Sequence, residues 1–237
     1  MADNAAIRPL LEVKGVAKAF GPRLLFRRVD AALMPGTLSL LAGANGAGKS
    51  TLMRVMAGLT RADAGTVSLN IPEEKLGYMA HATFLYPGLS ANENLMFWAT
   101  AAGLDNAAAR VKAALETVGL SRHAEERAGI FSRGMAQRLN LARLILTDPK
   151  LILLDEPATG LDVSSRRMLL DLMLEARSRG AAILWISHDV EEDARHGVEH
   201  VEDKHLTKGR SQPEHGGGRL RGELVTRVQR EAEQEDQ

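Results

Sequence analysis

Short runs rich in apolar residues alternate with longer, helix-like stretches along most of the chain. The runs lie at 38–41, 66–69, 76–79, 151–154 and 181–186, and they have the length and composition of strands. Strands that alternate with helices favour a mostly parallel sheet with helices around it. The pattern therefore predicts an α/β fold in which 151–154 is a central strand.

Three of the expected helices follow one another without a strand between them. The first begins at Ser90-Ala91-Asn92-Glu93, which has the sequence of a capping box, and runs toward Gly103. The second covers 107–118, and the third begins at Ser132. We expect these helices to form a subdomain of about residues 90–147, inserted into the α/β core. Two further helices are expected between strands, one ending near Gly58 and one over 168–176.

The apolar pattern fades toward the end of the chain. Beyond His188 the apolar residues are scattered among charges, so we expect only weak edge strands there. Charged residues and Gly216-Gly217-Gly218 then dominate. We expect the folded domain at residues 8–210 and a frayed or disordered tail at 211–237.

Composition narrows the possible partners. The 237 residues are enough for one large α/β domain, and the 30 basic and 30 acidic residues balance to zero formal charge. A zero balance argues against broad binding of nucleic acid or of an anionic membrane surface. The chain has no Cys, which excludes disulfides. No secretory signal and no bilayer-spanning run is expected from the sequence, so any membrane link is expected to run through a partner chain.

Residues 43–50 match the phosphate-binding pattern G-x-x-x-x-G-K-[ST] between an expected strand and an expected helix. Backbone N–H groups at a helix N-terminus surround a polyphosphate, and glycines let the backbone come close. Lys49 would supply a cation for the β- and γ-phosphates, and Ser50 a hydroxyl for Mg²⁺. The alternative is a glycine-rich turn with an unrelated lysine. The predicted nucleotide-binding loop comprises Gly43, Ala44, Asn45, Gly46, Ala47, Gly48, Lys49, Ser50 and Thr51.

Two acids, Asp155 and Glu156, end the strand at 151–154. The carboxyl ends of parallel strands face the ligand crevice, so both acids are expected beside the glycine loop. Asp155 would hold Mg²⁺, and Glu156 would orient and polarise the attacking water. The alternative is a solvated strand end with surface acids.

With these motifs in place, the chain resembles the ABC ATPase family from Leu11 to about Arg210. The resemblance implies a P-loop NTPase fold of the ABC ATPase type, with an antiparallel β portion beside the mostly parallel core sheet. It also implies an ATP hydrolase coupled to transport, using ATP and Mg²⁺. The expected catalytic residues are Lys49, Glu156 and His188. For His188 the role comes from the resemblance, because spacing alone favours a surface or capping residue.

The resemblance adds further nucleotide-binding residues. Phe20 matches the aromatic residue that stacks on adenine, with a core Phe as the alternative. Ser132 and Gly134, in Ser132-Arg133-Gly134-Met135, match the family signature, which covers the γ-phosphate of the opposite subunit in trans. Asp162 lies in a loop like the one that crosses the dimer interface. His81 stands where most of the family has Gln, which reaches Mg²⁺ and the attacking water; the alternative is an exposed loop His.

The resemblance also implies partners. The chain is expected to form a homodimer and to bind no nucleic acid. It is also expected to be a peripheral protein at the cytoplasmic face of the inner membrane, where it binds integral membrane permease subunits. His81 and residues 131–135 most resemble the ATP-binding subunit of the haem exporter of cytochrome c maturation. The alternatives are another small ABC exporter and a soluble, non-transport ABC ATPase. A P-loop kinase or nucleotide switch would leave the signature and His188 without a purpose.

Overall fold

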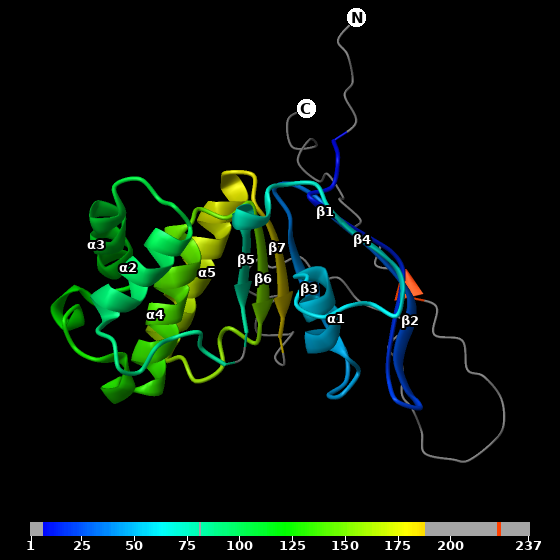
Figure 1. The fold of residues 1–237 in the computed structure, drawn as a ribbon, viewed down its shortest axis with the longest axis horizontal. Coiled ribbons are helices and arrows are strands. Elements are labelled where there is room, and N and C mark those ends of the chain that lie inside the picture. The colour runs from blue at the N-terminus through cyan, green and yellow to red at the C-terminus, as the bar shows by residue number, and fades with distance from the viewer. Residues whose placement is uncertain (1–6, 81, 188–221, 224–237) are drawn as a thin grey trace, which may run out of the picture.

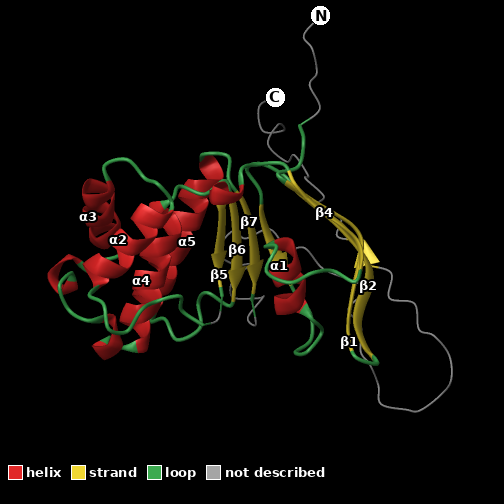
Figure 2. Ribbon diagram, viewed as in Figure 1, coloured by secondary structure: helices red, strands yellow, loops and turns green. Residues whose placement is uncertain are grey.

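The computed structural model describes residues 7–80, 82–187 and 222–223, and it contains two sheets (Figures 1 and 2). The first sheet has the order β4-β1-β2-β8. β1 pairs antiparallel with β2 and β4, and β2 pairs parallel with β8. Its strands are β1 (Leu11–Phe20), β2 (Arg23–Leu33), β4 (Ala64–Leu69) and β8 (Gly222–Glu223).

The second sheet is parallel throughout and has the order β3-β7-β6-β5. Its strands are β3 (Leu38–Leu41), β5 (Leu76–Met79), β6 (Leu151–Asp155) and β7 (Ala182–Ile186). They match the expected strands to within one residue, and β6 lies between two neighbours. The predicted α/β fold with a parallel and an antiparallel sheet is therefore confirmed.

The parallel sheet separates two apolar cores. Along β6, Ile152 and Leu154 face the core that contains α2 to α5, whereas Leu151 and Leu153 face the core that contains α1 and the first sheet. Every residue of β6 is buried. Successive side chains of a strand point to opposite faces. Because both faces of β6 are covered, its residues from Leu151 to Leu154 are all apolar and do not alternate with polar ones.

Helices lie on both sides of the parallel sheet (Figure 1). α1 (Lys49–Met56) packs on the side of the first sheet. The other side carries α2 (Ala91–Ala101), α3 (Ala107–Thr117), α4 (Arg133–Leu146) and α5 (Val163–Ser178). Short 3₁₀ helices are η1 (Glu73–Lys75), η2 (Ser121–His123) and η3 (Ala128–Ile130).

The helix starts follow the capping chemistry. The Ser90 hydroxyl accepts from the Glu93 N–H at 3.1 Å, and the Glu93 carboxylate accepts from the Ser90 N–H at 2.8 Å. This confirms the predicted capping box. α5 begins five residues before the expected 168–176 because Asp162 caps it, which apolar periodicity alone does not reveal.

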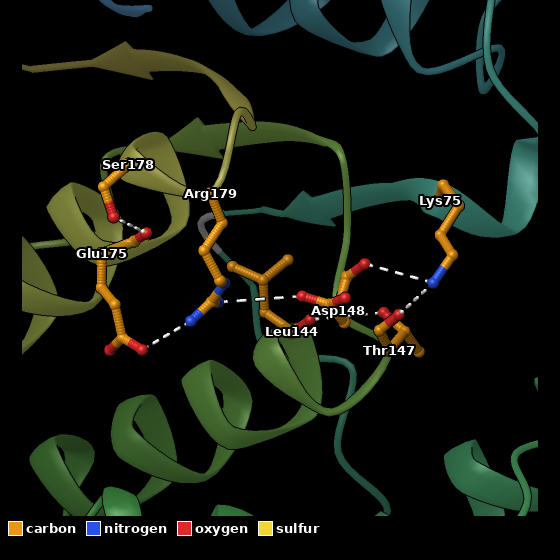
Figure 3. A network of polar contacts seen from close by, with 7 residues as sticks. All are labelled: Lys75, Leu144, Thr147, Asp148, Glu175, Ser178 and Arg179. Atoms are coloured by element: carbon orange, nitrogen blue, oxygen red, sulfur yellow. Dashed lines mark hydrogen bonds and ion pairs between the residues drawn. The ribbon is translucent and has the colours of Figure 1, made fainter. Parts of the chain in front are cut away.

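A polar network joins the elements at the edge where β5, β6 and β7 begin (Figure 3). The Lys75 ammonium donates to the carbonyls of Thr147 at 3.2 Å and Asp148 at 3.3 Å. The Arg179 guanidinium lies 3.7 Å from the Asp148 carboxylate. These contacts tie the end of α4 to the starts of β5 and β7, which leaves the opposite edge of the sheet for a site.

Several expectations lie outside the described residues. They include His81, His188 and the weak strands expected after His188. Within the expected tail the structure describes only Gly222 and Glu223, which form β8 beside Val29 and Asp30 of β2.

Candidate functional site

The carboxyl ends of β3 and β6 are level at one edge of the parallel sheet. Both strands pair with β7, and both Leu41 and Asp155 lie opposite Ile186 in the two registers. The glycine loop follows β3 and the two acids end or follow β6. The sheet register therefore brings the predicted phosphate loop beside the predicted metal ligand, although they are over a hundred residues apart in sequence.

The loop between β3 and α1 relies on glycine conformations. Gly46 and Gly48 have φ of 77° and 97°, where other residues are strained. Gly48 is the N-cap of α1, and a Cβ there would lie 2.7 Å from Leu25 Cγ and 3.0 Å from a Phe26 ring carbon. Glycine has no side chain with which to cap the helix. The first N–H groups of α1 are thus left to bind an anion.

Lys49 is held inside this loop. Only 7% of the residue is exposed, and its ammonium donates to the carbonyls of Gly43 at 2.7 Å and Ala44 at 3.1 Å. Burial lowers the pKa of Lys49, and the charges of Glu156 and Asp155 partly oppose that shift. The buried Lys49 ammonium is therefore held inside the loop by two carbonyl groups and has little contact with water.

The next residue, Ser50, contacts the first acid. The Ser50 hydroxyl donates to the Asp155 carboxylate at 2.9 Å, and Asp155 is 5% exposed. A hydroxyl and a carboxylate are the oxygen ligands that suit Mg²⁺, which usually takes few protein ligands and the rest from water and phosphates. In the described part of the chain, no group of three or more His, Asp or Glu could hold a metal on its own. The pair therefore fits a metal that arrives with a polyphosphate.

Glu156 has an unusual backbone conformation. Its φ is 54°, in the left-handed region, which costs a non-glycine residue about 1–3 kcal/mol. The surrounding hydrogen bonds hold it there: its N–H donates to the Ile186 carbonyl at 3.1 Å, and its carbonyl accepts from the Thr159 N–H at 3.2 Å. Backbone strain of this kind collects at functional sites.

These elements enclose a cleft of about 510 Å³. It joins the glycine loop and Glu156 to Phe20, which lies at the end of β1 and is 57% exposed. Of the predicted loop, Gly43, Ala44 and Ala47 are not among the lining residues. The cleft is lined by Phe20, Arg23, Leu25, Asn45, Gly46, Gly48, Lys49, Ser50, Thr51 and Glu156.

Sequence reasoning missed Arg23 and Leu25. They lie on β2, and Arg23 pairs directly with Phe20 across the hairpin. Because residues two apart on a strand share a face, a hairpin following Phe20 would have placed both beside it. That signal depends on β1 and β2 being strands, which the apolar pattern of residues 11–33 does not predict.

Three predicted site residues cap or begin other helices. The Ser132 hydroxyl accepts from the Met135 N–H at 3.3 Å at the start of α4, and Gly134 lies in its first turn. The Asp162 carboxylate accepts from the Ser165 N–H at 2.7 Å, and its hydrogen bonds lower the pKa of Asp162. In the described part of this chain, none of the three lines the cleft. These three residues are therefore separate from the cleft that contains the glycine loop.

α4 makes two further sets of contacts that the sequence did not reveal, and the first of them lies beside Glu156. The buried Gln137 amide donates to the carbonyl of Pro157, next to Glu156, at 2.8 Å. At the far end of α4, Arg143 donates to the Tyr78 carbonyl at 2.8 Å and lies 5.1 to 5.2 Å from the rings of Trp98 and Phe84. Burial lowers the pKa of Arg143 to about 10, so it stays charged at neutral pH.

The glycine loop, Glu156 in the cleft, the Ser50–Asp155 pair and the two-sheet fold define a P-loop nucleotide-binding protein. A family model described as ABC transporter matches residues 26–159. The chain therefore belongs to the ABC transporter family. Among the described residues, no helix has the length and apolarity to span a membrane.

Similar proteins within the family have names that state different functions. The chain is 33% identical over 194 residues to the linearmycin resistance ATP-binding protein LnrL of Bacillus subtilis (strain 168), covering 77% of this chain and 62% of that protein's length. It is 39% identical over 178 residues to the cytochrome c biogenesis ATP-binding export protein CcmA of Cereibacter sphaeroides, covering 75% and 82%. A solved structure described as the ATP binding subunit of an ABC transporter matches with a TM-score of 0.74 and 30% identity, covering 79% and 82%.

Proposed function

We propose that this chain is the ATP-binding and ATP-hydrolysing subunit of an ABC transporter. The observation that carries the proposal is the convergence of Lys49, the Ser50–Asp155 pair and Glu156 at one sheet edge. Each group has a separate task in phosphoryl transfer, and Phe20 lies in the same cleft at a place suited to a base.

Binding begins with the polyphosphate. The amides at the start of α1 donate to its oxygens, and the Lys49 ammonium exchanges its two carbonyl partners for β- and γ-phosphate oxygens. Ser50 and Asp155 would hold Mg²⁺, which neutralises charge on the phosphates when bound. Arg23 adds a second cation at the cleft wall.

Hydrolysis then depends on Glu156. Its carboxylate would accept a hydrogen bond from a water and align it with the γ-phosphorus. As the new P–O bond forms, the bond from phosphorus to the bridging oxygen breaks. ADP leaves, and the released inorganic phosphate keeps the oxygen and the protons of the water. Lys49 stabilises the charge that develops on the phosphate oxygens. We propose that His188 and His81 contact the γ-phosphate or the water, as the family resemblance implies.

A second copy of the chain would complete the site. In a head-to-tail dimer, Ser132 and Gly134 of one copy would cover the ATP held by the other, and the loop ending at Asp162 would cross between them. This arrangement accounts for the exposure of Ser132 and for its absence from the lining of the cleft. Closing and opening of the dimer would drive permease subunits at the cytoplasmic face of the membrane.

The test is the variant Glu156→Gln, which keeps the shape of the side chain but removes its charge. We expect Mg-ATP to bind with a Kd within about threefold of the parent value and hydrolysis to fall by at least about a hundredfold. Size-exclusion chromatography should show an ATP-dependent dimer that persists. Glu116→Gln, an exposed glutamate on α3, is the matched control. Parental turnover by Glu156→Gln would contradict the proposed role.

For the transported substrate, we propose haem for cytochrome c biogenesis. The support is the 39% identity to CcmA over 82% of its length, together with His81 and residues 131–135. Export of another small molecule is the second candidate, supported by the similarity to LnrL. Co-expression with each candidate permease and measurement of membrane sedimentation would separate them. Sedimentation with a drug-type permease and none with a haem permease would reject the haem proposal.

A further inference from the structure

Phe20 follows a stretch of β1 in which the pairing register shifts repeatedly, beginning between Val13 and Val16. The β1–β4 register shifts between Lys14 and Ala17 and ends at the Ala17–Ala64 pair, and the β1–β2 register shifts between Lys18 and Ala19. The next residue, Gly21, turns the chain with φ of 56°. An exposed ring at the end of such a strand needs additional contacts to keep one orientation.

Asp63, which directly precedes β4, provides these contacts. One carboxylate oxygen accepts from the Lys18 ammonium at 2.9 Å, and the other accepts from the Ala19 N–H at 2.7 Å. The Asp63 N–H donates in return to the Ala17 carbonyl at 2.9 Å. A single residue therefore binds all three residues that precede Phe20.

Lys18 extends this connection to the ring itself. Its ammonium lies over the Phe20 ring, 5.4 Å from the centroid. The Lys18 side chain is only 12% exposed, so its position is restricted. The hydrogen bonds from Lys18 and Ala19 lower the pKa of Asp63, and its carboxylate stays ionised at neutral pH. With the cation over one face of the ring, the opposite face is the one available for stacking.

We propose that Asp63 is a positioning residue for the nucleotide base: through Lys18 and Ala19 it orients Phe20 so that one ring face stacks on the base. The inference rests on the proposed function, because it takes the cleft to bind ATP. It makes a separable claim, since Asp63 would act on the base and not on the phosphates.

The experiment measures Kd by calorimetry for Mg-ATP and for Mg-tripolyphosphate, which has no base. Stacking of one base on an aromatic ring accounts for about tenfold in Kd, so Phe20→Ala should weaken Mg-ATP binding by about that factor. Asp63→Ala should weaken it about three- to tenfold and Lys18→Met somewhat less. All three should leave the tripolyphosphate Kd within about twofold. The double variant Asp63→Ala, Phe20→Ala should be no weaker than Phe20→Ala alone.

Asp105→Ala, an exposed aspartate between α2 and α3, is the matched control. Equal weakening of both ligands by Asp63→Ala would show a merely structural role and overturn the inference, as would an unchanged Mg-ATP Kd. Should Asp63→Ala fail to fold, Lys18→Met and Asp63→Asn give the same contrast between the ligands. If the parent chain binds neither ligand, the proposed function itself fails, and the inference falls with it.

Discussion

The helices α1 and α4 both begin beside a functional motif, but their first turns are built differently. α1 begins at Gly48, a left-handed glycine, and the buried Lys49 follows it. α4 begins at Ser132, whose hydroxyl accepts from the Met135 N–H. Both N-termini carry the partial positive charge of a helix start. Among the described residues, the start of α1 lines the cleft and no residue of α4 does.

Under the proposed function, the difference separates two kinds of anion site. The start of α1 is enclosed by Leu25 and Phe26 and leaves its amides to a ligand. The start of α4 is stabilised by its own serine and lies at the surface, where a second molecule can reach it. On this account the chain carries a complete phosphate cradle and one exposed half of a second site.

The substitution Gly48→Ala should break the first site. A Cβ would lie 2.7 Å from Leu25 Cγ, and alanine is strained at φ of 97°. We expect a loss of about 2–4 kcal/mol in the free energy of unfolding, from strain and overpacking together. Mg-ATP binding should weaken by more than about a hundredfold, measured by calorimetry on folded protein.

The matched control is Gly134→Ala in the first turn of α4. Its Cβ would meet only the Gly160 carbonyl at 4.0 Å. Alanine favours a helix over glycine by about 0.5–1 kcal/mol, so stability should hold or rise. The single chain should bind Mg-ATP with the parental Kd. Equal losses of Mg-ATP binding in the two variants would remove the distinction between the helix starts.

Ser132→Ala should have a smaller effect. Loss of the N-cap costs about 1 kcal/mol, which lowers Tm by about 2–4 °C in a chain of this size. Mg-ATP binding by the single chain should not change, whereas turnover should fall at least about tenfold because the neighbour's γ-phosphate loses a donor. Ser132→Thr, which keeps the hydroxyl, should recover most of the Tm. Parental turnover by Ser132→Ala would argue against a role in trans.

The sequence predicts the parallel sheet well because its strands are short apolar runs with clear ends. It also predicts the helix starts at Ser90 and Ser132, where a serine caps the helix, but not the start that Asp162 caps. β1 and β2 are not predicted as strands because register shifts interrupt their alternation. The antiparallel portion was predicted from the family resemblance and not from this pattern.

The residues of the site likewise fall into those that the sequence predicts and those that it does not. Lys49, Ser50, Asp155 and Glu156 belong to local motifs with a chemical reason for their spacing. Asp63 does not, because its contacts to Lys18 and Ala19 span 45 and 44 positions and depend on how β4 meets β1. Contacts of this kind follow from the fold and leave no short pattern in the sequence.

The central claim is that the start of α1 and the Lys49 ammonium bind a polyphosphate. Calorimetry with Mg-ATP tests it most directly, on the parent chain, on Lys49→Ala and on the exposed control Lys112→Ala. We predict saturable binding for the parent and the control, and a Kd at least about a hundredfold higher for Lys49→Ala. Equal affinity in all three proteins, or no binding by the parent, would contradict the claim.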